Sequence, residues 1–310
     1  DTRSGKQRLL GEQAMAEAAG QPSPMMVVRR MRFGYPDRLK AWWNPSRREF
    51  SQMVNAASLA MPFLEPYLIE TMRLAKARIA DPKLSAEIDL YIGQESTHYR
   101  QHQVFNRRLA ELGYAAVPQM EALLKADYAG FAAGKSFAFN LAYAEGFESM
   151  ALAMGHFLVA DRVALFGDGD DAVGSLILWH FVEEIEHKRV TYDAFHALDG
   201  RYWMRIWGYL RATAHIMSRT RQGYRALLIE DGLWRSWRSR IALAAMLGRI
   251  FLRLAPRMLR VLRPGYDPRE IKDPGWARAW QRLHNERPDM SGVLDMRRLA
   301  EPIPHLLELS

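Results

Sequence analysis

Cysteine is absent from the 310 residues of the sequence. This absence excludes a disulfide framework, a thiolate metal site and a cysteine nucleophile. Glutamate, aspartate and histidine are then the side chains left to bind a metal ion. Because these are oxygen and imidazole donors, any metal site in the chain favours metals such as iron or manganese.

Long apolar runs and strand-like patterns are also missing. No apolar stretch approaches the roughly 20 residues that a membrane-spanning helix needs, and no signal peptide is evident, so we expect a cytoplasmic protein. Few stretches alternate apolar and polar residues with the period of two that is typical of strands. Hydrophobic residues make up 49% of the chain and aromatic residues 11%, which is enough for a large core. The sequence therefore predicts an all-α fold.

No linker rich in proline, glycine and serine divides the chain, so we expect one domain with extensions. The predicted parts are a flexible, basic N-terminal segment (1–44), a four-helix bundle (45–200) and a basic, aromatic helical extension packed on the bundle (201–310). Within the bundle, Asp81 and Pro82 are typical of a helix cap and first helical residue. The acidic loop around Asp170 favours a second helix cap, because it lacks the order of a calcium-binding loop.

The most informative stretch is HFVEEIEHKRVTYD, residues 180–193. His180, Glu184 and His187 are spaced four and then three residues apart, which places their side chains on one face of a helix. The rest of that face is largely apolar, so an ionised carboxylate there needs a partner. Imidazole and carboxylate at this spacing form a metal-ligand arrangement known from helical bundles. The alternative interpretation is a solvated helix face on which the histidines are accidental.

A second Glu-x-x-His motif lies upstream in the sequence IGQESTHYRQHQVF. Glu95, His98 and His102 again share one stripe of a predicted helix, with apolar residues before and after them. The distance to the first motif leaves room for another long helix between the two. This repetition makes coincidence a poorer explanation than a metal site.

The two remaining helices of a four-helix bundle each offer a glutamate. Glu65 lies on an apolar stripe before the first motif, and Glu148 and Glu145 lie one turn apart between the motifs. Glu148 is preferred because its helical neighbours are apolar, and Glu145 stays an alternative. The resulting order of E, ExxH, E and ExxH over four helices predicts a dinuclear metal centre.

These motifs carry a family resemblance. The ligand order resembles that of the ferritin-like di-iron carboxylate proteins, and residues 45–200 more closely resemble a bacterial family described as predicted metal-dependent hydrolases. The run EExEHK is the most specific part of that resemblance, and the spacing H-x-x-x-E-x-x-H is similar to the last ligand helix of the arylamine N-oxygenases. The chain departs from the pattern at Pro66, directly after Glu65, where a kink is expected. The resemblance implies a ferritin-like bundle and a metal site made of Glu65, Glu95, His98, Glu148, Glu184 and His187, with His180 as a seventh ligand.

Side chains beside the ligands are also expected, because ligating imidazoles need hydrogen-bond partners that fix their tautomers. Gln94 and Glu183, each adjacent to a ligand glutamate, are the candidates, with Asp193 behind them. His102 is either a further ligand or a histidine hydrogen-bonded within the core.

The ligand set favours one reaction class over two others. Carboxylates that balance or outnumber imidazoles, without thiolate, resemble O2-activating di-iron sites more than zinc hydrolase sites. The main hypothesis is an enzyme with two iron ions, or manganese in their place, that uses O2 as co-substrate to oxidise or oxygenate a small apolar or aromatic molecule, with an electron donor as a partner. The alternatives are a hydrolase that uses metal-activated water and a non-catalytic iron-binding or membrane-associated protein.

After residue 200 the sequence becomes aromatic, apolar and rich in arginine, and the whole chain has a net charge of +8 and a pI near 9.7. The pattern predicts amphipathic helices with a basic face. Such helices either pack on the bundle with their arginines in water or bind anionic lipid or an acidic partner, which would make the protein peripheral to a membrane. No nucleic-acid-binding motif is visible, which argues against nucleic acid, and a homodimer is left open.

Overall fold

The computed structural model describes residues 26–285 and 292–307. Within these ranges the chain forms α-helices, short 3-10 helices and an isolated antiparallel bridge between Leu294 and Leu306, so the predicted all-α class is confirmed. The α-helices are α2 (Arg48–Ser58), α3 (Met61–Lys76), α4 (Pro82–Glu111), α5 (Ala116–Gly134), α6 (Phe137–Ala160), α7 (Arg162–Phe166), α8 (Asp171–Glu186), α9 (Val190–Leu198), α10 (Tyr202–Glu230), α11 (Trp237–Val261) and α12 (Gly275–Asn285).

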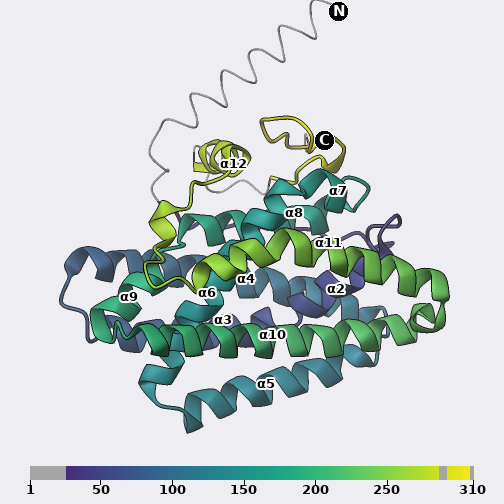
Figure 1. The fold of residues 1–310 in the computed structure, drawn as a ribbon. Coiled ribbons are helices and arrows are strands. Elements are labelled where there is room, and N and C mark those ends of the chain that lie inside the picture. The colour runs from purple at the N-terminus through teal and green to yellow at the C-terminus, as the bar shows by residue number, and fades with distance from the viewer. Residues whose placement is uncertain (1–25, 286–291, 308–310) are drawn as a thin grey trace, which may run out of the picture.

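Four of these helices enclose the interior that holds the predicted ligands. Helix α3 packs on α4, α6 packs on α8, and both α3–α6 and α4–α8 contacts close the arrangement. Helices α10 and α11 run across the same side of the molecule, where both contact α2 and α6 (Figure 1). Helix α5 lies against α10, and α12 lies against α8. The ligand-bearing helices are therefore covered on several sides by the rest of the chain.

Proline determines where the first ligand helix begins. Helix α2 ends at Ser58, and α3 begins at Met61, directly before Pro62. Because proline has no N–H, the carbonyl of Ser58 loses its helical donor, and the side chain of Asn106 donates to that carbonyl instead, at 3.0 Å. Pro66 lies inside α3, which continues past it to Lys76.

Two glycines allow α6 and α10 to cross closely. A Cβ atom at Gly208 would lie 2.1 Å from the carbonyl oxygen of Ala142, and one at Gly146 would lie 2.4 Å from the backbone of Tyr209. Any side chain at either position would force the helices apart. This contact joins the predicted extension after residue 200 directly to a ligand helix.

The helix caps follow the sequence signals, but the last ligand helix ends one residue before His187. Asp81 accepts a hydrogen bond from the backbone of Lys83 at the start of α4, and Asp170 caps α8 in the same way, as predicted. Helix α8 ends at Glu186, and α9 begins only at Val190. In the break, the ammonium group of Lys188 donates to the carbonyl of Ile271 and to Asp273.

The described part of the N-terminal segment, residues 26–44, has no helix but packs into the core. Met31, Phe33 and Trp43 are buried, and they belong to one hydrophobic cluster with residues of the bundle and of the extension, such as Tyr209. Residues 1–25 lie outside the described residues.

None of the described helices is both long enough and apolar enough to cross a membrane.

Candidate metal centre

Seven acidic and histidine side chains, all at most 3% exposed, lie between α3, α4, α6 and α8. They form two groups, and the ligand atoms within each group lie within 4.8 Å of one another. The sequence predicted each of the seven as a ligand, and the structure brings all of them together. The first group is Glu65, His98 and His180; the second is Glu95, Glu148, Glu184 and His187.

The second group is arranged around one imidazole nitrogen. Nε2 of His187 lies 3.2 Å from Oε2 of Glu148, 3.2 Å from Oε2 of Glu184 and 3.4 Å from Oε1 of Glu95. The hydroxyl of Tyr91 donates to the other oxygen of Glu148 at 2.7 Å, which orients that carboxylate. One nitrogen and three carboxylates in this space are a suitable donor set for a hard or borderline cation.

The first group adjoins the second through shared carboxylates. Nε2 of His180 lies 3.9 Å from Oε1 of Glu65 and 2.9 Å from Oε1 of Glu184, whose other oxygen faces the second group. Similarly, Oε1 of Glu95 lies 3.7 Å from Nδ1 of His98. The glutamates of the two E-x-x-H motifs are thus each near both groups, as expected for carboxylates that bridge a pair of metal ions.

Several potential metal-binding atoms of the cluster have no hydrogen-bond partner within the described residues. Both carboxylate oxygens of Glu65, both of Glu95 and Nδ1 of His98 are buried without a hydrogen bond. Leaving a buried polar atom unsatisfied costs about 1–3 kcal/mol, and more for a charged one. Because these atoms belong to the two candidate ligand groups, metal ions there would satisfy all of them.

The charges of the cluster also indicate that it is suited to bind metal ions. Burial, reinforced by the neighbouring carboxylates, holds the pKa values of Glu65 and Glu148 well above their ordinary value. Burial also acts to raise the pKa of Glu184, but the adjacent imidazoles of His187 and His180 outweigh it and lower that pKa. Buried carboxylates are stable only when paired with positive charge, and two divalent cations would neutralise the four carboxylates of the cluster.

Hydrogen bonds from outside the cluster fix which nitrogen each imidazole offers. The amide nitrogen of Gln94 donates to Glu186 at 2.5 Å, so its oxygen faces Nδ1 of His187 at 3.0 Å. His187 must donate through Nδ1, which leaves Nε2 free to bind a metal. Sequence reasoning expected this role for Gln94.

Glu183 plays the corresponding part for His98. Nε2 of His98 lies 2.9 Å from Oε2 of Glu183, and the other oxygen of Glu183 accepts a hydrogen bond from Arg29 at 2.7 Å. Burial acts to lower the pKa of His98, but Glu183 and Glu95 raise it to about 9. The carboxylate of Glu183, in turn, has a lowered pKa because His98 and Arg29 outweigh its burial. Nδ1 of His98 is therefore directed toward the cluster.

Two further predicted residues lie outside the cluster. Glu145 accepts a hydrogen bond from Ser149 at 2.9 Å and lies 4.0 Å from Arg205 of α10, so it faces α10 and not the ligands. Asp193 forms an ion pair with Arg269 at 2.5 Å and is not among the side chains that the structure brings to the imidazoles. Of the two glutamates considered on α6, only Glu148 belongs to a ligand group.

Sequence reasoning missed Arg29 and Glu186, which contact the residues that orient the imidazoles. Arg29 is fully buried and pairs with both Glu183 and Glu186. Glu186 belongs to the EExEHK run, so its position offered a signal. Arg29 offered none, because it lies in an irregular segment more than a hundred residues away in sequence.

The described residues thus define an all-α protein whose helices enclose a carboxylate- and histidine-rich cluster suited to two metal ions. Over residues 27–272 the chain matches the family model described as predicted metal-dependent hydrolase, and it belongs to that family. The family description names a metal-dependent enzyme and specifies hydrolysis, which was the alternative and not the main functional hypothesis from the sequence. No curated protein and no solved structure matches the chain.

Proposed function

We propose that this protein is a dinuclear metal-dependent hydrolase that acts on a predominantly apolar molecule. The observation that supports this proposal is the position of His180, which belongs to a ligand group and also lines a large cavity. A molecule bound in the cavity would therefore reach the metal centre. The family description supports hydrolysis as the reaction.

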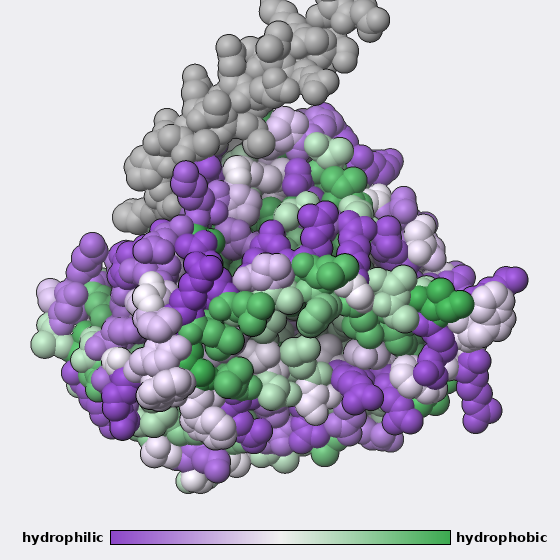
Figure 2. Space-filling model, viewed as in Figure 1, coloured by the Kyte–Doolittle hydropathy of each residue, from purple (hydrophilic) through white to green (hydrophobic). Residues whose placement is uncertain are grey.

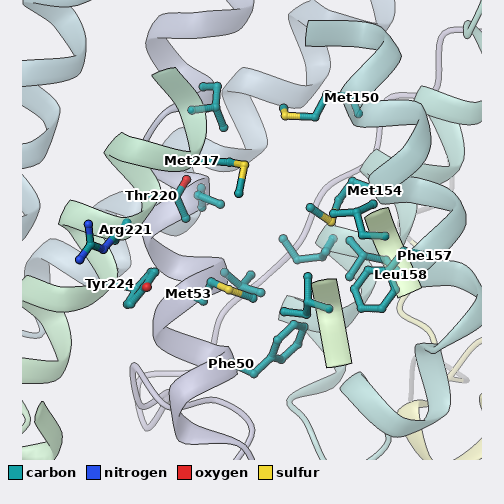
Figure 3. A pocket seen from close by; sticks show the side chains of 18 of the residues that line it. Phe50, Met53, Met150, Met154, Phe157, Leu158, Met217, Thr220, Arg221 and Tyr224 are labelled. Carbon is teal, nitrogen blue, oxygen red and sulfur yellow. The ribbon is translucent and has the colours of Figure 1, made fainter. Parts of the chain in front are cut away.

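The cavity has a volume of about 1130 Å³ and is lined mainly by apolar side chains of α2, α6, α8, α10 and α11. Figure 3 shows methionines from three of these helices around it: Met53 of α2, Met154 of α6 and Met217 of α10. Flexible methionine side chains adapt to irregular apolar ligands. A cavity of this size and lining favours a ligand with a long apolar portion.

The polar groups of the cavity suggest how such a ligand would lie. His180 and His102 are buried at its inner end, whereas Arg221 is exposed to solvent. The hydrolysable bond would lie beside His180, and the apolar portion would extend toward α10. Divalent cations held by the two ligand groups would supply Lewis-acid chemistry that activates water and polarises the bond to be cleaved.

The chain's own residues would prepare this site in two ways. Gln94 and Glu183 hold His187 and His98 in the orientation that presents one nitrogen each to the cluster, so little rearrangement accompanies metal binding. The apolar lining excludes bulk water from the part of the cavity that holds the substrate, which strengthens electrostatic interactions at its inner end.

The test compares metal-loaded protein with metal-free protein on p-nitrophenyl esters of increasing acyl length. We expect hydrolysis only with divalent metal, with kcat/KM rising from acetate to decanoate because longer chains fill the cavity. Met154→Trp should remove the preference for long chains while metal content stays unchanged, and Leu74→Trp on the exposed side of α3 is the control. Metal-loaded protein that cleaves no ester, amide or phosphoester with any divalent metal would refute the hydrolase proposal.

A second candidate function is oxidation by O2 at a di-iron centre. It is favoured by the donor set itself, in which four buried carboxylates accompany the imidazoles without any thiolate. The ferritin-like relationship and the iron identity remain predictions from the sequence. Anaerobic loading with Fe(II) followed by measurement of O2 uptake separates the two candidates. A hydrolase would consume no oxygen beyond slow iron oxidation, whereas an oxidase should consume it stoichiometrically and within seconds.

A further inference from the structure

Helix α10 presents a stripe of exposed apolar side chains to solvent. These residues recur four and three positions apart, so they lie along one helix face. Isolated exposed apolar residues are ordinary, but a continuous stripe that includes tryptophans requires an explanation. The stripe consists of Trp203 (76% exposed), Trp207 (55%), Leu210 (48%) and Met217 (60%).

Helix α11 carries a second such stripe, on the same side of the molecule as α10 (Figure 1). Its apolar side chains are largely exposed, and they include an indole and a phenyl ring. Figure 2 shows the hydrophobic side chains gathered in a band over α11 and the space between α11 and α10, with hydrophilic side chains around it. The members of this stripe are Trp237 (67% exposed), Ile241 (61%), Phe251 (69%), Leu252 (74%) and Leu259 (63%).

The charges around the two stripes are almost entirely positive. Between residues 200 and 266 the sequence has only two acidic residues, the adjacent Glu230 and Asp231, and both are engaged with the start of α5 and its neighbours. Exposed arginines flank the apolar residues along both helices, including Arg211, Arg238 and Arg253. Asp161 is buried and pairs with Arg249 and Arg253, so the exposed charges that border the stripes are mainly those of arginines. Such a surface is complementary to one that is apolar within and negatively charged outside.

The large cavity opens between the two stripes. Met217 of α10 and Leu247 of α11 are both exposed and both line the cavity. A molecule that enters or leaves the cavity would therefore pass through the surface that carries the stripes. An apolar ligand is poorly soluble in water, so an entrance at a lipid surface would supply it more readily than an entrance at open solvent.

We propose that the surface formed by the two stripes, the α10–α11 face, docks on an anionic lipid bilayer. Its tryptophans and aliphatic side chains would enter the interfacial region, and its arginines would contact the anionic headgroups. A second copy of the chain fits this face less well, because a symmetric contact would place arginines mainly against arginines. The proposal goes beyond the hydrolase assignment and does not depend on it, since docking requires no metal.

The test measures binding of the full chain to vesicles of phosphatidylcholine, with and without phosphatidylglycerol, by co-sedimentation. We expect binding to the anionic vesicles only, and weakening as salt is raised because screening reduces the attraction to headgroups. The double substitution Trp207→Glu/Phe251→Glu places charge on both stripes and should weaken binding at least tenfold. Both side chains are largely exposed, so the fold and the metal content should remain those of the wild type.

Matched variants distinguish binding through the α10–α11 face from a general effect of the protein's net charge. Leu74→Glu, at a 44% exposed position on α3, should bind like the wild type. Arg238→Gln/Arg240→Gln should weaken binding about tenfold, whereas Arg100→Gln/Arg107→Gln on α4 removes the same charge and should have little effect.

Three outcomes would overturn the proposal. The first is wild-type protein that does not sediment with anionic vesicles. The second is equal loss of binding in the α4 and α11 arginine variants, which would indicate attraction by net charge alone. The third is a dimer in solution that the Trp207→Glu/Phe251→Glu variant converts to a monomer without any vesicle binding by either protein, which would assign the face to a second copy.

Discussion

Nε2 of His102 lies 2.8 Å from Nδ1 of His180, and this contact determines which nitrogen His180 presents to the metal cluster. The hydroxyl of Ser58 donates to Asn106 at 2.6 Å, so it accepts from Nδ1 of His102, 2.8 Å away. His102 must then accept through Nε2, and His180 must donate through Nδ1. The lone pair on Nε2 of His180 is consequently directed at Glu65 and Glu184.

This chain of hydrogen bonds predicts that His180 binds a metal ion and that His102 orients it. Burial lowers the pKa values of both histidines, which keeps both neutral. His180→Phe preserves bulk but removes the donor, so metal content measured by elemental analysis should fall from about two ions per chain toward one. The control is His196→Phe, at an exposed position of α9. Unchanged metal content in His180→Phe would show that His180 is a core residue and not a ligand, and would leave the other six residues as ligands.

Glu184 is predicted to be required for both metal ions, because its two oxygens face the two ligand groups. Glu184→Gln keeps the side-chain volume but removes the charge and replaces one acceptor by a donor. We expect loss of most bound metal and a weakening of metal affinity by at least a hundredfold. Glu70→Gln, on the solvent side of α3 with a side chain 60% exposed, should bind metal like the wild type. Wild-type metal content in Glu184→Gln would mean that the cluster is not the metal centre.

Arg29 is predicted to support the metal centre without contacting the metal. It is buried between Glu183 and Glu186, so Arg29→Met would remove one counter-charge from each of two buried carboxylates and leave Glu183 with His98 alone. Removing one partner of a buried ion pair costs about 3–5 kcal/mol of stability, and loss of the constraint on Glu183 should weaken metal binding about 10-fold to 100-fold. Arg30→Met, at the adjacent exposed position, is the matched control for thermal unfolding and metal titration. Equal behaviour of the two variants would contradict this role.

The residues that the sequence could identify lie on regular helices or, in the case of His187, directly after the last residue of one. The spacing within the two E-x-x-H motifs places Glu95 beside His98 and Glu184 beside His187 whatever the rest of the fold does, and the apolar stripes around Glu65 show which side faces inward. The apolar helical neighbours favour Glu148 over Glu145 but leave the choice open, because both lie on buried sides of α6. It depends on the crossing of α10, which places Arg205 near Glu145.

Features that depend on packing between distant parts of the chain leave no local pattern in the sequence. Arg29 reaches Glu183 from a segment without periodicity. In the break after α8, Lys188 contacts a loop that follows α11. The cavity beside His180 likewise exists because α10 and α11 pack on α6 with a space between them. Sequence periodicity predicts the buried face of each helix, but not the distance between two helices.

The final prediction is that metal binding becomes stronger as pH rises. In the metal-free protein the pKa of His98 is raised from 6.5 to about 9, and the pKa values of Glu65 and Glu148 are raised above 4.5. A group with a raised folded-state pKa contributes stability that is complete below its unfolded pKa and is lost as pH rises through the folded value. The contribution of these three groups to the stability of the metal-free protein should therefore be lost from about pH 5 toward pH 9.

Metal ions need the same groups in their deprotonated forms, so binding releases protons and is favoured at higher pH. The difference in Tm between metal-loaded and metal-free protein should consequently widen between about pH 5.5 and pH 8.5. Differential scanning calorimetry over this range measures the difference directly. The Glu184→Gln variant, which should bind little metal, provides the control and should show almost no difference at any pH. A metal-dependent shift in Tm that stays constant or narrows toward pH 8.5 would show that protons do not compete with the metal at His98, Glu65 and Glu148.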